Sequence, residues 1–193
     1  MTANSPAPGS EDNREDLVRR LLLSLGEDPG REGIADTPGR VARSLGFLTE
    51  GYTIDVPGLL ADALFEAEAD EMVVVKDLEF FSLCEHHMLP FYGRCHVGYL
   101  PDKRIVGLSK IGRVVDAYSR RLQVQERLTT QVAEAIQAAV EPKGVAVVME
   151  ARHLCMMMRG VQKQTSQAVT SCMLGRFKQD ARTRGEFLQL IKE

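Results

Sequence analysis

The sequence has few cysteines and lacks long apolar runs, which excludes several classes of protein. Only four of its 193 residues are cysteine, too few for a disulfide scaffold, so in a reducing compartment they are better suited to bind metal or to fill the core. No apolar run reaches the length of a membrane span, and residues 1–16 lack the apolar segment of a secretory signal. We therefore expect a cytoplasmic protein that does not enter a membrane.

Net charge and chain length limit the function and the domain organisation that the sequence allows. A net charge of -3 with 26% charged residues argues against a general nucleic-acid binder. Residues 1–16 are rich in Pro, Ser, Asn and acidic residues, which predicts a disordered leader. The length favours one domain, so we expect a single domain over 17–193, with a helical part over 17–65 and the main core over 71–193.

The spacing of apolar residues predicts alternating groups of helices and strands. Helical spacing predicts helices over 17–25, 109–120 and 125–140, one that begins at Thr37-Pro38 and ends at Gly51, and a short one around 187–191. β-branched or alternating runs predict strands over 72–75, 94–100, 145–153 and 168–174, with a linker over 57–70. This order of elements predicts an α+β fold with an antiparallel sheet.

Two short segments carry most of the residues that can bind a metal. Cys84 and His87 are spaced so that one turn can direct a thiolate and an imidazole to one ion, and Cys155 offers a third ligand. Three protein ligands leave a position for water, which favours a catalytic site over a structural one. Two thiolates and one imidazole favour zinc. Cys95 and Cys172 have no such neighbours and are expected to pack in the core.

Two further histidines lie beside these ligands. On an extended strand His153 and Cys155 would share a face, so we expect His153 in the metal pocket. His86 adjoins His87 and is badly placed for the same ion, which leaves it free to move protons. If His86 were instead a fourth ligand, a structural zinc module would be favoured. A zinc deaminase fits poorly, because its Glu follows the His by two positions and its Pro-Cys-x-x-Cys pair is absent.

Cations lie in the first turns of two predicted helices, where the helix dipole favours anions. They are Lys110 and Arg113 after Ser109, and Arg40 and Arg43 after Thr37. Backbone N–H groups, a capping hydroxyl and these cations would together bind phosphate, with Arg159 and Lys163 adding charge near Cys155. Each cation alone is equally well explained as ordinary surface charge.

Glu126 lies at the start of the predicted helix 125–140. A carboxylate there commonly stabilises the helix dipole. It can also accept two parallel hydrogen bonds from N1–H and the exocyclic amine of guanine, a pattern that adenine does not offer.

Four segments together resemble the GTP cyclohydrolase I family, and they occur in the order of that family. They are Cys84-Glu85-His86-His87, Gly107-Leu108-Ser109-Lys110-Ile111, Gln123-Val124-Gln125-Glu126-Arg127-Leu128 and His153-Leu154-Cys155-Met156-Met157-Met158-Arg159-Gly160. The resemblance runs from about residue 31 to the C-terminus. It implies the tunnelling fold, an antiparallel sheet with two helices on one face, here with an N-terminal helical extension. It also implies a homodecamer with sites at subunit interfaces.

The resemblance further implies a reaction and the residues that perform it. GTP and water would give formate and 7,8-dihydroneopterin triphosphate, the first step of tetrahydrofolate and pterin biosynthesis. His153 would protonate the base as water attacks C8, and His86, with Ser109, would move protons during the later rearrangement. The implied zinc ligands are Cys84, His87 and Cys155, the catalytic residues are His86, His153 and Ser109, and the substrate-binding residues are Glu126, Gln125, Lys110, Arg113, Arg159, Arg40 and Arg43.

Overall fold

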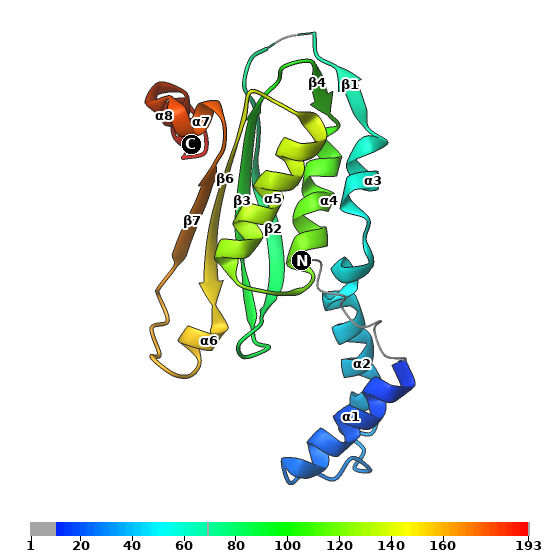
Figure 1. The fold of residues 1–193 in the computed structure, drawn as a ribbon. Helices are drawn as coiled ribbons and strands as arrows, with labels where there is room; N and C mark the ends of the chain where they lie inside the picture. Colours follow the sequence, from blue (N-terminus) through cyan, green and yellow to red (C-terminus); the bar gives the residue numbers. More distant parts are fainter. Residues whose placement is uncertain (1–10, 69, 193) are drawn as a thin grey trace. The chain divides into compact units, whose positions relative to one another are not determined.

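The computed structural model describes residues 11–68 and 70–192, and the chain divides into two compact units, Met1–Thr49 and Glu50–Glu193 (Figure 1). In the first unit, helix α1 (Glu11–Ser24) packs against α2 (Thr37–Leu48). The predicted disordered leader is therefore wrong for residues 11–16, and residues 1–10 lie outside the described residues. Acidic residues suit the beginning of a helix, and Glu11 also lies 3.7 Å from Arg43 of α2.

The second predicted helix is confirmed, with small differences at its ends. Asp36 is the N-cap of α2, so Thr37 is already helical. The helix ends at Leu48, and the 3-10 helix η1 (Glu50–Thr53) begins the second unit.

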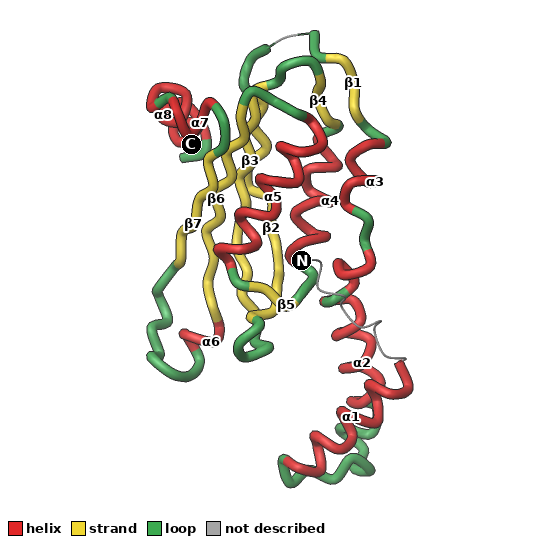
Figure 2. The backbone as a smooth tube through the Cα atoms, viewed as in Figure 1, coloured by secondary structure: helices red, strands yellow, loops and turns green. Residues whose placement is uncertain are grey.

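The second unit is built on a five-stranded sheet, seen edge-on in Figure 1 and traced in Figure 2. Its strand order is β5-β2-β3-β6-β7, and all neighbours pair antiparallel except β5, which runs parallel to the end of β2. The bounds are β2 Val73–Cys84, β3 Pro90–Leu100, β5 Leu122–Gln123, β6 Gly144–His153 and β7 Ala168–Met173. A separate pair joins β1 (Leu64–Glu66) to β4 (Arg104–Val106).

Helices cover both faces of this sheet, and the α+β prediction is confirmed. Helices α4 (Leu108–Ser119) and α5 (Gln125–Val140) pack on one face, where Val147 and Met149 of β6 are fully buried. Ala146 and Val148 alternate to the other face and meet Phe177 and Phe187 of two short helices. Those helices are α7 (Arg176–Gln179) and α8 (Ala181–Leu190). Among the helices described, none combines the length and apolar character needed to cross a bilayer.

Several segments differ from the sequence predictions. The expected linker over 57–70 contains β1 and most of helix α3 (Val56–Ala61), whose Val56 and Leu60 are buried in the main core. This segment therefore belongs to the same compact unit as the sheet. Strand β2 continues to Cys84 because its pairing with β3 resumes after an irregularity between Val75 and Leu78, where Asp77 takes a φ of 58°. The sequence prediction stopped at Val75 because the run of β-branched residues ends there, just before this irregularity.

We predict that Gly93→Ala disrupts the centre of the sheet. A Cβ at Gly93 of β3 would lie 1.8 Å from the carbonyl oxygen of Glu150 and 2.7 Å from Cα of Ala151, both backbone atoms of β6. The forced shift should cost about 3 kcal/mol and lower Tm by roughly 6–12 °C. Gly185→Ala on α8 is the control, because its added Cβ meets nothing within 4 Å. Thermal unfolding followed by circular dichroism compares the two, and equal Tm values would contradict the prediction.

Candidate metal centre

The first two candidate ligands are joined by a tight turn at the end of β2. Cys84 is the last residue of that strand, and its carbonyl oxygen accepts the backbone N–H of Met88 at 2.7 Å. The N–H of Cys84 in turn donates to the carbonyl oxygen of Leu89 at 2.9 Å. Met88 takes a positive φ of 53°, which lets the chain reverse. The turn brings His87 Nδ1 to 3.8 Å from Cys84 Sγ, as the sequence spacing predicts.

Cys155 completes the cluster, but from a helix and not from a strand. Strand β6 ends at His153 and the short helix α6 (Leu154–Met157) begins at once, so the expected alternation of His153 and Cys155 along one strand is wrong. The potential ligand atoms of Cys84, His87 and Cys155 nevertheless lie within 4.8 Å of one another. In the described ranges 11–68 and 70–192, no other His, Cys, Asp or Glu group of three or more converges in this way.

The chemistry of this trio fits a divalent cation. Burial raises the pKa of the Cys155 thiol, and the neighbouring Cys84 raises it further, against a smaller lowering by Arg159. Two adjacent thiolates repel each other, and a bound divalent cation removes that penalty. Two sulfur ligands and one imidazole nitrogen are a donor set that zinc accepts with tetrahedral geometry.

Arg159 lies directly against this cluster. Its Nη1 is 3.0 Å from His87 Nε2, so the guanidinium donates and the imidazole accepts there. The proton of a neutral His87 is then on Nδ1, on the side of Cys84. A metal ion bound through either ring nitrogen would replace one of these two contacts.

His86 and Glu85 occupy the same turn but differ in their partners. His86 is exposed, with Nδ1 3.9 Å from Cys84 Sγ and Nε2 3.8 Å from a carboxylate oxygen of Glu85. Glu85 pairs with Arg127 of α5, and this hydrogen bond is the main cause of its lowered pKa. Arg127 also donates from Nε to Gln123 Oε1 at 2.9 Å. Sequence analysis did not predict this link between the turn and α5.

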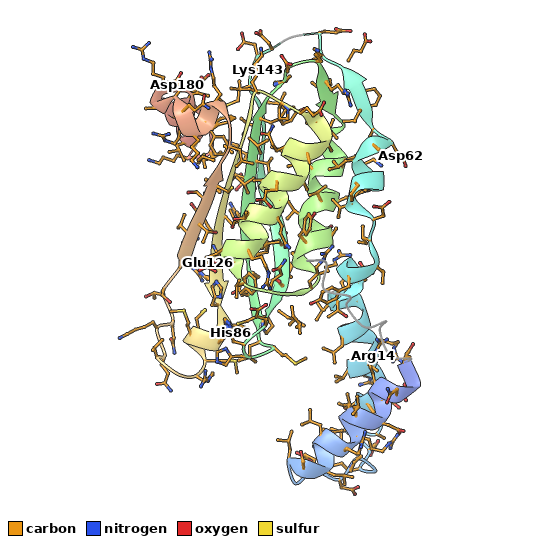
Figure 3. The ribbon with its side chains drawn as sticks, in the orientation of Figure 1. Arg14, Asp62, His86, Glu126, Lys143 and Asp180 are labelled. Atoms are coloured by element: carbon orange, nitrogen blue, oxygen red, sulfur yellow. The ribbon has the colours of Figure 1, made fainter. Side chains whose placement is uncertain are left out.

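His153 is held between an aromatic ring and an amide. Its ring is stacked on Phe91, with centroids 4.7 Å apart and planes 3° apart, and its Nε2 lies 2.8 Å from Gln125 Oε1. Burial lowers the pKa of His153, while the nearby Glu126 raises it to a smaller extent. Figure 3 shows Glu126 and His86 in the half of the sheet nearer α6, away from Lys143. Sequence reasoning missed Phe91, whose role follows from its pairing opposite His153.

The structure does not bring every predicted site residue to this cluster. Helix α4 has Ser109, Lys110 and Arg113 at its beginning. Its C-terminal end leads into β5, where Gln123 pairs with Cys84 of β2. A helix of this length extends about 18 Å, so these residues are at the far end from the metal cluster. The N-cap of α4 is Gly107, so Ser109 is not the capping hydroxyl that the sequence suggested.

The remaining basic candidates lie on exposed surfaces. Arg40 and Arg43 are on α2 of the first unit, where Arg40 pairs with Asp36 at 3.0 Å. Lys163 is exposed in the segment after α6, and its backbone N–H donates to the carbonyl oxygen of Met156.

Fold and site together define an α+β protein with a candidate catalytic metal centre of two cysteines and one histidine. A family model described as GTP cyclohydrolase I matches residues 14–192. The protein named GTP cyclohydrolase 1 from Deinococcus radiodurans is 57% identical over 187 residues, covering 97% of this chain and 87% of that protein. The one from Methylococcus capsulatus is 58% identical over 177 residues, covering 92% of this chain and 96% of its own. The chain therefore belongs to the GTP cyclohydrolase I family and is a hydrolase.

One solved structure is also similar in part. The archaeosine synthase QueF-Like in the apo form aligns with 56% of this chain and 97% of its own, at 19% identity and a TM-score of 0.47. A likeness at this level supports no conclusion about the present chain.

We predict that Cys155→Ser removes stable metal binding. The substitution takes away one of three converging ligands, and it should weaken zinc affinity by more than the roughly 10–100-fold that loss of a supporting partner costs. Competition with a chromophoric chelator measures the affinity, and elemental analysis measures zinc per chain. Cys172→Ser is the matched control, because Cys172 lies on β7 outside the cluster. Full zinc content in Cys155→Ser would exclude the cluster as the metal centre.

Proposed function

We propose that the protein uses zinc to convert GTP and water into formate and 7,8-dihydroneopterin triphosphate, the first step of tetrahydrofolate and pterin biosynthesis. The observation that carries this proposal is the convergence of Cys84, His87 and Cys155 in a chain of the GTP cyclohydrolase I family. His153, two residues before Cys155, is held in a fixed orientation close to this group. Zinc and the product are our inference from the donor set and from the family.

We assign each step of the proposed reaction to a residue according to its surroundings in the structure. A zinc ion held by Cys84, His87 and Cys155 would lower the pKa of a coordinated water to about 7, which provides a nucleophile for C8 of the purine at neutral pH. His153 protonates the imidazole portion of the base as C8 is attacked. His86 is exposed at the mouth of the turn, which suits it to the later proton transfers on the ribose, together with Ser109.

Glu126 is the residue that we assign to guanine recognition. It is exposed at the first turn of α5, next to Gln125, and its charge acts on His153. Its carboxylate accepts hydrogen bonds from N1–H and the exocyclic amine of guanine. The base would then lie between Glu126 and the metal centre.

The placement of the predicted triphosphate residues supports a site shared between chains. Within one chain, Lys110 and Arg113 are separated from the metal cluster by the length of α4. We propose that a second copy supplies them, with Ser109, while Arg159 acts from the metal side and Arg40 and Arg43 come from a neighbouring first unit. This arrangement agrees with the tunnelling-fold homodecamer that the family resemblance implies. Free thiols at the centre favour a reducing, cytoplasmic location.

We predict that zinc-loaded protein releases formate and a neopterin product from GTP in equal amounts, and neither from ATP. Formate is assayed enzymatically, and the pterin by fluorescence after oxidation. Cys155→Ser should abolish both products, and Cys172→Ser should retain them. Formate without pterin would mean that the reaction stops at ring opening. No product from the zinc-loaded protein would overturn the proposed reaction.

We also predict that two inactive variants restore each other when mixed. Cys155→Ser lacks the metal centre and Lys110→Ala lacks a phosphate contact, so a mixed assembly would contain some sites with both groups intact. The two proteins are coexpressed or unfolded and refolded together, and GTP turnover is measured. The control is Cys155→Ser with His153→Ala, because both residues come from the same end of one chain and mixing should restore nothing. Failure of the first pair to recover activity would exclude the shared site.

A further inference from the structure

Gln125 is enclosed where α5 meets the last two strands of the sheet. The residue is 1% exposed, and its side-chain nitrogen lies 3.1 Å from each of three oxygens. Those oxygens are the carbonyls of Met149 and Ala168 and the hydroxyl of Thr170. The two N–H groups of the amide are therefore fully engaged inside the protein.

The surrounding groups fix which end of this amide is nitrogen. The two carbonyl oxygens can only accept hydrogen bonds. Thr129 Oγ1 donates its hydrogen to the backbone carbonyl of Gln125 at 2.7 Å. The Thr170 hydroxyl, 2.7 Å from Thr129 Oγ1, must then donate to Thr129, which leaves its oxygen free to accept from the amide. A reversed amide would set its oxygen against the carbonyl oxygens of Met149 and Ala168, so the nitrogen faces the strands.

The oxygen end of the amide therefore faces His153. Gln125 Oε1 lies 2.8 Å from His153 Nε2, and an amide oxygen only accepts, so Nε2 must carry a hydrogen. A neutral His153 then has its lone pair on Nδ1. Parallel stacking on the fully buried Phe91 holds the plane of the ring. The amide and the aromatic ring thus fix both the orientation and the tautomer of His153.

We propose that Gln125 is a positioning residue for His153. It holds one hydrogen on Nε2, so that Nδ1 is the nitrogen that takes up a second proton from water and passes it to the purine, which returns the ring to its neutral Nε2–H form. This inference rests on the proposed function, in which His153 protonates the base. Gln125 then acts on GTP only through His153, and not by the direct contact that the family resemblance implies. The two neighbouring residues of α5 therefore have different proposed roles. Glu126 is exposed and would bind guanine, whereas Gln125 is buried and would orient His153.

Gln125→Met tests this role by steady-state kinetics on the zinc-loaded protein. Methionine has a similar length but cannot accept the hydrogen of Nε2. A general acid contributes roughly 10²–10⁴-fold to a rate, so we expect kcat to fall at least about tenfold, with KM for GTP within about twofold of wild type. Thr170→Val loosens the amide without removing it and should lower kcat by a smaller factor. An increase in KM with unchanged kcat would identify a direct substrate contact and overturn the proposal.

Gln137→Met is the matched control for loss of an amide from the same helix. Gln137 donates one hydrogen bond, to the carbonyl oxygen of Pro142, at the opposite end of α5. This variant should keep wild-type kcat. If both variants lowered kcat and thermal stability equally, the effect would be structural and the positioning role would be rejected.

A spectroscopic readout decides the tautomer without any turnover. Nitrogen-15 NMR of histidine-labelled, zinc-loaded protein distinguishes protonated from unprotonated ring nitrogens, and the His153→Ala spectrum identifies the signals of His153. We expect hydrogen on Nε2 in wild type and a shift of the proton toward Nδ1 in Gln125→Met. Wild-type protein with the hydrogen on Nδ1 would refute the inference. Wild-type protein that turns over no GTP but shows hydrogen on Nε2 would refute the proposed function and leave the orientation by Gln125 established.

Discussion

The antiparallel pairing of β3 with β6 is the constraint on which the site depends. Its register sets Phe91 opposite His153, and the pairing of β2 with β3 sets Leu83 opposite Pro90. The end of β6 is thereby held beside the turn that follows Cys84, although the two segments are far apart in the sequence. Cys155 needs only the first turn of α6 to reach this position. Candidate metal ligands from two distant segments therefore converge because the sheet aligns the strand ends.

The same pairing explains why the cluster suits a cation. It places two thiols close together, where burial and the neighbouring Cys84 raise the pKa of the Cys155 thiol, and Arg159 offsets only part of this effect. Arg159 is also engaged with His87, so its charge is directed at the ligands themselves. A divalent ion opposes both burial and thiolate repulsion, and it does so at the point where the three ligand atoms meet. Local electrostatics thus agree with the ligand spacing in favouring a metal centre.

Much of this could be predicted from the sequence, because the signals involved are local. Cys84 and His87 lie in a single turn, as their spacing predicts, and the predicted helix over residues 125–140 has the same bounds as α5. Predictions failed where a distant segment decided the structure. The β-branched run of β2 ends at Val75, but pairing with β3 continues the strand beyond the irregularity at Asp77, and α6 begins before Cys155 can extend β6.

The proposed role of Gln125 could not be predicted from the sequence for the same reason. The orientation of its amide depends on Ala168 and Thr170 of β7, and the sequence around Gln125 contains no pattern that predicts these contacts. Sequence similarity can align Gln125 with substrate-binding positions, but only the polarity of the hydrogen bonds around it shows that its amide faces inward. The link between Arg127 and Glu85 is a second case, since it joins residues that only the folded chain brings together.

His86 and His153, which sequence analysis placed in one site, differ in their burial. His153 is stacked on Phe91 and hydrogen-bonded to Gln125, so its ring has one orientation. Burial lowers its pKa, which disfavours the doubly protonated ring. His86 is exposed on the turn beside the ligands and is free to change its partner. In the proposed reaction, a proton delivered once to a fixed atom of the base would need the first kind of residue, because misplacement by even a small distance costs rate. The proposed successive transfers along an opening ribose would need the second kind, since the accepting atoms would move as the reaction proceeds.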